Sequence, residues 1–162
     1  MVEAFSILVE FAVAISGFSG ITIALQSREG EVDALRSFRN RVLLAWSLCA
    51  AFGALSPQGG ALLGLTGGDL WSFAGLFVSA LMFVAVASGF IGRSRLSQQD
   101  RAKLNPAIWR AGVVGSGVVA LVLLANTAIG LGVPPPAAVF WSLVWMIGFA
   151  ALNFYRNLFG PS

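Results

Sequence analysis

The stretch LVEFAVAISGFSGITIAL, residues 8–25, is an apolar run interrupted by one carboxylate, Glu10, and by a cluster of Ser and Gly. A helix needs about 20 predominantly apolar residues to cross a bilayer. Extended back to Ala4, the run reaches that length. It therefore predicts a membrane-spanning helix over residues 4–25.

The rest of the chain is equally apolar. With 57% hydrophobic and 10% charged residues, it has too little polar surface to coat a water-soluble globule. Further runs of spanning length lie at residues 42–65, 70–92, 111–131 and 137–155. We predict an all-α fold, a polytopic transmembrane helix bundle forming one domain over residues 1–162. It has about five spans, or four if Glu3 and Glu10 keep the first run in the interface.

The second run has two interpretations. Ser56-Pro57 interrupts it and two glycines follow. Proline removes a backbone donor and clashes with the preceding helical turn. The helix therefore either kinks at Pro57 or stops near Leu55 and hands over to a loop.

Basic residues are confined to alternate connections. The ten Lys and Arg residues lie between the first and second runs, between the third and fourth, and after the fifth. Short loops rich in Lys and Arg stay in the cytoplasm. The predicted topology is N-terminus out and C-terminus in. We expect the lipid bilayer, not nucleic acid, to be the partner, with headgroups contacted by Arg36, Arg39, Arg41, Arg93, Arg95, Lys103 and Arg110.

Both basic connections carry helix signals. Val32, Leu35, Phe38 and Val42 recur at helical spacing and predict an amphipathic helix running into the second span. Farther along, Ser97 with Asp100 resembles a capping pair, and Asn105-Pro106 resembles a helix start.

The sequence offers no set of residues for catalysis. It has no His and one Cys, Cys49, and it lacks metal, nucleophile and phosphate-loop motifs. GVVGSG at residue 112 has the composition of a nucleotide loop but lies in a spanning run, so we interpret Gly112 and Ser116 as helix-packing positions. We predict a protein that is not an enzyme and uses no cofactor or metal.

A helical projection of the first run separates its residues into faces. Small and acidic residues share the side of Glu10, and a second narrow face of small residues lies apart from it. Small residues let helix backbones approach one another, so we expect this helix to be packed by neighbours. The first face includes Glu3, Ser6, Gly17 and Gly20, and the second includes Ser16 and Ser19.

Three polar residues are predicted to share one layer of the membrane. Glu10, Asn126 and Ser142 each lie about 7–9 Å from the outer end of their predicted spans, at a rise of 1.5 Å per residue. A carboxylate there must be protonated, hydrogen-bonded or reached by water. We expect Asn126 to be its partner and expect Glu10 never to face lipid.

The first 57 residues carry a resemblance. GFSGITIAL, a basic stretch and FRNRVLLAWSLCAAFGALSP resemble a loose set of small, uncharacterised bacterial integral membrane proteins. The resemblance implies the bacterial inner membrane and supplies no activity and no functional residues.

Two functions are compatible with these patterns. In the first, a homo-oligomer places the acidic, small-residue face of its first helix, with Glu3, Ser6 and Glu10, around an ion-conducting pore. In the second, the chain is a non-conducting membrane scaffold or a partner subunit of a membrane complex, and the same face is an interface with another membrane or cytoplasmic protein.

Overall fold

The computed structural model of the chain describes residues 2–26 and 34–159, and within these ranges it contains helices and no strands. In chain order the helices are α1 (Val2–Gln26), α2 (Ala34–Ala54), α3 (Ser56–Leu62), α4 (Gly67–Ser94), α5 (Gln98–Lys103), α6 (Pro106–Ile129) and α7 (Pro135–Phe159). Five segments of the described chain are long and apolar enough to cross a membrane, with α2 and α3 counted as one. The predicted all-α bundle of five candidate spans is confirmed.

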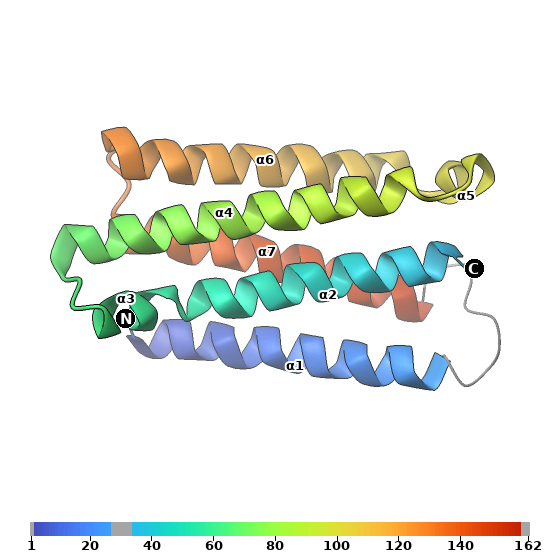
Figure 1. Ribbon diagram of the computed structural model, residues 1–162, viewed down its shortest axis with the longest axis horizontal. Coiled ribbons are helices and arrows are strands. Elements are labelled where there is room, and N and C mark those ends of the chain that lie inside the picture. Colours follow the sequence, from blue (N-terminus) through green and yellow to red (C-terminus); the bar gives the residue numbers. More distant parts are fainter. Residues whose placement is uncertain (1, 27–33, 160–162) are drawn as a thin grey trace.

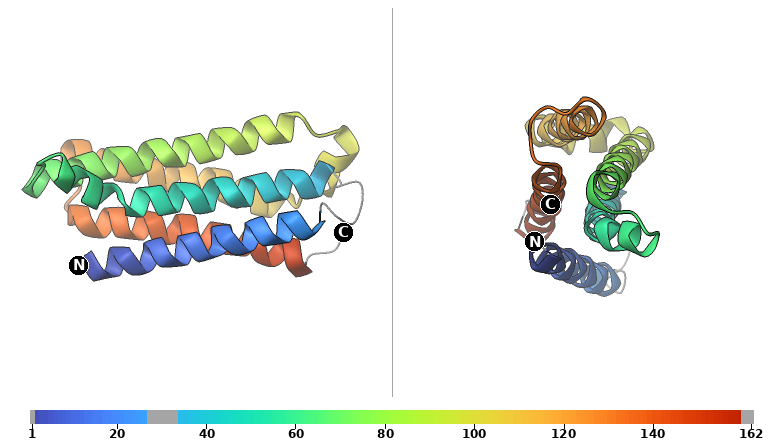
Figure 2. Two further views of the ribbon diagram at one scale, coloured as in Figure 1. Left: turned by 60° about the horizontal axis from the view of Figure 1, so that its bottom comes forward. Right: turned by 90° about the vertical axis from the view of Figure 1, so that its left-hand side faces the viewer.

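The long helices run side by side along the long axis of the molecule (Figure 1). Seen from one end, they follow the order α1, α2, α4, α6 and α7 around the bundle (Figure 2). α7 packs against each of the other four long helices. Because the number of long helices is odd, α1 begins at the end of the bundle where α3 lies, and α7 ends at the opposite end, where α5 also lies.

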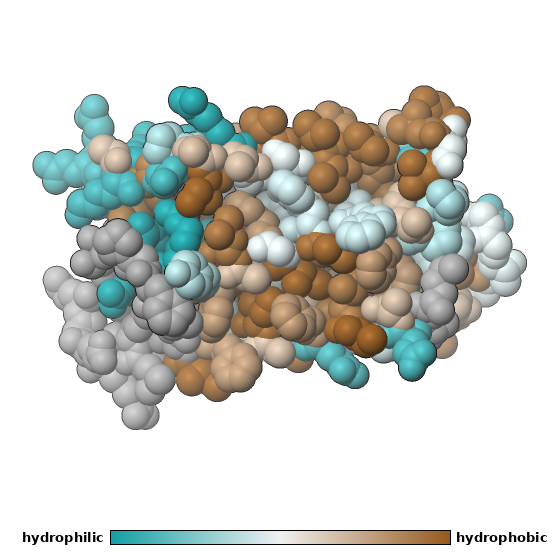
Figure 3. All heavy atoms as spheres, turned by 180° about the vertical axis from the view of Figure 1, so that it is seen from behind, coloured by the Kyte–Doolittle hydropathy of each residue, from teal (hydrophilic) through white to brown (hydrophobic). Residues whose placement is uncertain are grey.

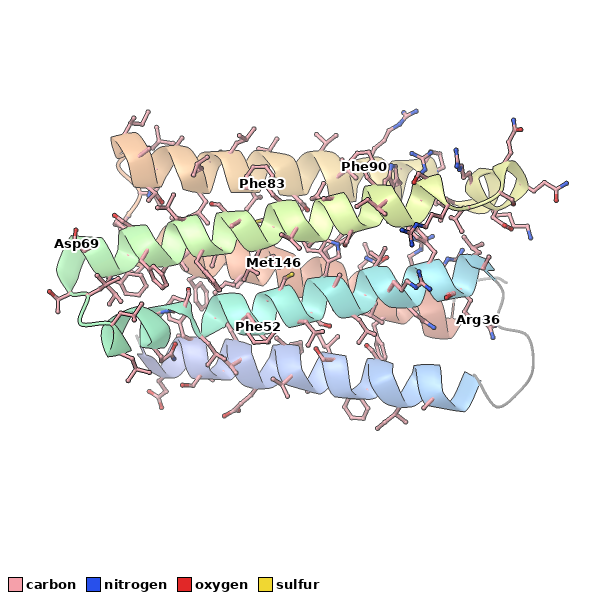
Figure 4. The ribbon with its side chains drawn as sticks, in the orientation of Figure 1. Arg36, Phe52, Asp69, Phe83, Phe90 and Met146 are labelled. Atoms are coloured by element: carbon pink, nitrogen blue, oxygen red, sulfur yellow. The ribbon has the colours of Figure 1, made fainter. Side chains whose placement is uncertain are left out.

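The centre of the bundle is filled by side chains of α2, α4 and α7. Leu43, Val78, Met82, Leu143 and Met146 are fully buried there, and Met146 lies in the interior in Figure 4. Apolar side chains also cover the outer surface of the long helices. A difference in polarity therefore does not separate inner from outer helix faces, and van der Waals packing determines which faces contact one another.

Small residues let α6 and α7 approach closely. A Cβ on Gly112 of α6 would overlap the Phe149 ring of α7. Nearby, the Trp145 indole of α7 donates a hydrogen bond from Nε1 to Ser116 Oγ of α6, at 3.0 Å. Both positions on α6 therefore contact α7 directly.

The helix of the second predicted span is interrupted at Ser56-Pro57. α2 ends at Ala54, but the chain continues into the short helix α3, which packs against α4, and not into a loop. The Ser56 hydroxyl donates to the Gly53 carbonyl at 2.6 Å, beside the proline that cannot continue the backbone ladder. The local helix signal of residues 56–62 was missed because its glycines indicate a loop.

The predicted amphipathic helix before the second span is confirmed from Ala34 onward. α2 runs without a break into the apolar segment, and Leu35, Phe38 and Val42 are buried along one face. Val32 lies outside the described residues.

The caps of the second basic connection are also confirmed. Ser97 Oγ accepts a hydrogen bond from Asp100 N at 3.1 Å, and Asn105 Oδ1 accepts from Ala107 N and Ile108 N at 3.0 and 3.3 Å. Arg101 folds back and donates to the carbonyls of Leu96 and Ser94. These contacts fix the turn that carries α5 against the last turn of α4.

On the face shown in Figure 3, apolar side chains cover the middle of the molecule, and hydrophilic side chains lie toward its two ends. Arg36 and Asp69 lie at opposite ends of the bundle (Figure 4). The described basic residues gather at the end that holds α5, since α2 begins there and α4 and α7 end there.

Candidate functional site

α1 lies at the edge of the bundle and packs against α2 and α7. Its inward face is formed by Phe5, Ala12 and Ser19, which are 2%, 0% and 1% exposed. The Phe5 ring contacts the rings of Trp71 and Phe140, with centroids 5.8 and 6.0 Å apart. Spacing by seven residues keeps these three positions on one side of the helix.

The two serines of the narrow face belong to this packed side. Ser19 Oγ donates to the Ile15 carbonyl at 2.6 Å, and half-buried Ser16 donates to the Ala12 carbonyl at 2.9 Å. Because these hydroxyls donate to carbonyls of their own helix, this face of α1 is left small and smooth. They let α1 approach α2 and α7 closely.

The acidic face points the opposite way. At 100° per residue, Glu10 lies about 160° around the helix from Ala12. Glu3, Ser6, Glu10, Gly17 and Gly20 are all exposed. A Cβ added to Gly17 or Gly20 would meet no atom within 4 Å. The expectation that Gly17 touches another helix backbone is therefore wrong within this chain, because α1 packs through its other side.

Glu10 lies about 12 Å along the axis from the first residue of α1. It has no hydrogen-bond or ion-pair partner among the described residues. The exposed bulky residues Ile7, Phe11 and Phe18 flank it on one side of the helix. Beyond the first turn of α1, which holds Glu3, Glu10 thus stands on an outer surface that is otherwise apolar or small.

The expected pairing of Glu10 with Asn126 is wrong within the chain. Asn126 Nδ2 donates to the Val133 carbonyl at 3.1 Å, and its Oδ1 accepts from Leu131 N at 3.1 Å. Its side chain therefore ties the end of α6 to the connection that leads into α7. Ser142 is buried in α7 and donates to the Ala138 carbonyl at 2.8 Å. Both polar groups stabilise their local backbone.

The basic residues expected at lipid headgroups fall into two groups. Most are exposed, namely Arg36, Arg41, Arg95, Lys103 and Arg110. Arg39 and Arg93 are half-buried, and the Nε atom of each is buried without a hydrogen-bond partner. The Arg93 guanidinium lies 5.0 Å from the centre of the Trp109 ring, a cation–π contact. Arg28 lies outside the described residues.

Two residues at the same end were not expected to belong to a site. Arg156 and Asn153 of α7 line a cavity together with Arg39 of α2. Their spacing of three residues puts both on one helix face. In the sequence, this spacing at the end of an apolar run was the signal that could have indicated the pair.

No cluster of three or more metal-ligating side chains occurs in the described part of the chain. Comparison with known protein families, curated protein sequences and solved structures finds no match to this chain. The outward face of α1 and the cavity lined by Arg39 and Arg156 are therefore interpreted from their own geometry.

Proposed function

We propose that the chain is a subunit of a homo-oligomer in which the outward faces of α1 surround a narrow ion pathway. The observation that carries the proposal is the position of Glu10, on the side of α1 opposite to its packed face. A carboxylate directed at lipid inside a membrane is costly, so protein or water covers it. No described residue of the same chain covers Glu10, so in this proposal a second subunit covers it.

The surface around Glu10 suits contact between subunits. Gly17 and Gly20 leave open space beside the helix backbone, so a neighbouring helix can approach closely. Closed rings are the usual solution for identical subunits. In such a ring the Glu10 carboxylates gather near one axis, where they attract cations and repel anions.

The basic end faces the cytoplasm in this proposal. Positive residues near helix ends hold short connections on the cytoplasmic side, which puts the start of α1 outside and the end of α7 inside. The bacterial inner membrane is supported by the resemblance of the first 57 residues to small bacterial membrane proteins. Glu10 then lies in the outer half of the pathway.

The alternative is a non-conducting scaffold or partner subunit. The open glycines favour it equally, because small residues on one face of a helix are typical of plain helix–helix contacts. In that case Glu10 forms a hydrogen bond across the contact, and its loss weakens assembly.

Glu10→Gln separates the two functions. The amide keeps the shape and much of the hydrogen bonding but removes the charge. Purified protein is inserted into planar bilayers, and the reversal potential is measured in a salt gradient. The pore predicts cation-selective currents whose selectivity falls in Glu10→Gln while the oligomer stays intact. Asp69→Asn, which removes an exposed carboxylate from the first turn of α4, is the matched control and leaves selectivity unchanged.

The pore is contradicted if no current is recorded across bilayers in which insertion of the oligomer has been verified. Loss of the oligomer in Glu10→Gln, measured by light scattering in detergent, supports the scaffold. An unchanged oligomer and unchanged selectivity contradict both roles for Glu10.

A further inference from the structure

The cavity at the basic end lies between α2, α4, α6 and α7 and is partly open to the surface. Its volume is about 40 Å³, more than the roughly 10–15 Å³ that one water needs. Aromatic side chains wall it, including Trp46 in edge contact with Phe149, at a centroid distance of 5.0 Å.

Two arginines line this cavity, and no Asp or Glu is among its described lining residues. Arg39 enters from α2 and Arg156 from α7, and the two positive charges repel each other. Arg39 Nε is buried and has no hydrogen-bond partner. Buried donors are nearly always paired, and a guanidinium stays charged at any physiological pH. The cavity therefore has the positive charge to attract an anion, and Arg39 has an unpaired donor.

A groove on the outer surface borders this cavity. It runs between α6 and α7 and shares Ile108 and Phe149 with the cavity. Its volume is about 570 Å³ and its lining is almost wholly apolar, and it includes Gly148 and Trp141, which is 66% exposed. An apolar groove on the lipid-facing surface suits a hydrocarbon chain.

We infer that the cavity and the groove together bind one anionic phospholipid, with its phosphate between Arg39 and Arg156 and an acyl chain between α6 and α7. Guanidinium groups match phosphate oxygens with paired hydrogen bonds. Basic pockets between transmembrane helices on the cytoplasmic side are typical sites for anionic headgroups. A zwitterionic headgroup brings an ammonium group that the two arginines repel. Free phosphate satisfies the arginines but leaves the groove unused.

The experiment measures the thermal stability of the purified protein in a mild neutral detergent. Phosphatidylglycerol, phosphatidylcholine and sodium phosphate are titrated separately. We expect phosphatidylglycerol to raise the melting temperature and the other two to leave it unchanged. An equal rise with phosphatidylcholine, or with inorganic phosphate, overturns the proposal, as does no response to phosphatidylglycerol.

The arginine variant tests the headgroup site. Arg39→Gln combined with Arg156→Gln is expected to raise the phosphatidylglycerol concentration at half-effect by at least about tenfold, since each charge-assisted contact is worth roughly that factor. The matched control, Arg36→Gln with Arg110→Gln, removes two exposed charges from the same end and leaves the half-effect concentration unchanged. Equal behaviour of the two double variants overturns the proposal.

A second variant tests the groove and is decisive if the arginine variant does not fold. A Cβ on Gly148 meets no atom within 4 Å, so Gly148→Leu adds its side chain to the groove from an open backbone position. We expect it to weaken the phosphatidylglycerol response at least about fivefold, through lost apolar contact with the acyl chain. Gly117→Leu, at an equally open position outside the groove, is its control. An unchanged response in Gly148→Leu overturns the proposal.

Discussion

Replacing Gly112 with Ala is expected to destabilise the protein, although alanine is the better helix former. A Cβ at this position would lie 3.2 Å or less from three atoms of the Phe149 ring. Non-bonded carbon atoms pack at about 3.5–4.0 Å, so the ring or the helix must move by about 1 Å. Overpacking costs about 1–3 kcal/mol, and the change from Gly to Ala gains up to about 1 kcal/mol in a helix. Because the overlap is large, we expect the upper part of this range, a fall in the free energy of unfolding of up to about 2 kcal/mol.

Gly117→Ala is the matched control on the same helix. A Cβ there meets no atom within 4 Å, so the helix-propensity gain of up to about 1 kcal/mol is left unopposed. Both variants are measured by reversible unfolding in mixed micelles of a mild detergent and dodecyl sulfate. Adding Phe149→Leu to Gly112→Ala relieves the overlap, and the cycle should show a coupling of at least about 0.5 kcal/mol. Equal effects of the two alanine variants, or no coupling, would refute the close contact of α6 with α7.

Three further predictions use other described contacts. Trp145→Phe removes the indole hydrogen bond to α6 and should lower the free energy of unfolding by about 0.5–1.5 kcal/mol, whereas Trp141→Phe, at an exposed position, should leave it unchanged in the same assay. Asn126→Ala leaves two backbone groups of the α6–α7 connection without their side-chain partner and should cost about 1–3 kcal/mol, seen as a lower thermal midpoint. Gly68→Cys in intact cells should react with an impermeant thiol reagent and Gln99→Cys should not, in a background without the native cysteine; the reverse pattern would invert the proposed topology.

The positions of the spans could be predicted because the bilayer imposes a length and a polarity on each helix. The run predicted at residues 4–25 is α1, Val2–Gln26, and the run at 70–92 is α4, Gly67–Ser94. The caps at Ser97 and Asn105 were also readable, since each depends on a side chain next to the backbone group that it satisfies.

The faces that pack together could be predicted only in part. Inside a membrane the lipid-facing and protein-facing sides of a helix are both apolar, so hydropathy does not separate them. The small residues of α1 occur on two sides, and the sequence alone does not tell that Ser19 is inside and Gly17 outside. The Asn126 side chain is hydrogen-bonded to the neighbouring backbone. Its predicted depth in the membrane had indicated Glu10 as its partner.

The contacts of α7 with the other four long helices have a consequence for biogenesis. A ribosome delivers helices in chain order, so the segments through α6 enter the membrane before the helix that joins them has been made. Until then the inner faces of α2 and α4, with Leu43, Val78 and Met82, have no α7 side chains to pack against. The contacts of α7 with the other long helices therefore form only after α7 has been synthesised, so the complete packing of α2 and α4 is reached late in biogenesis.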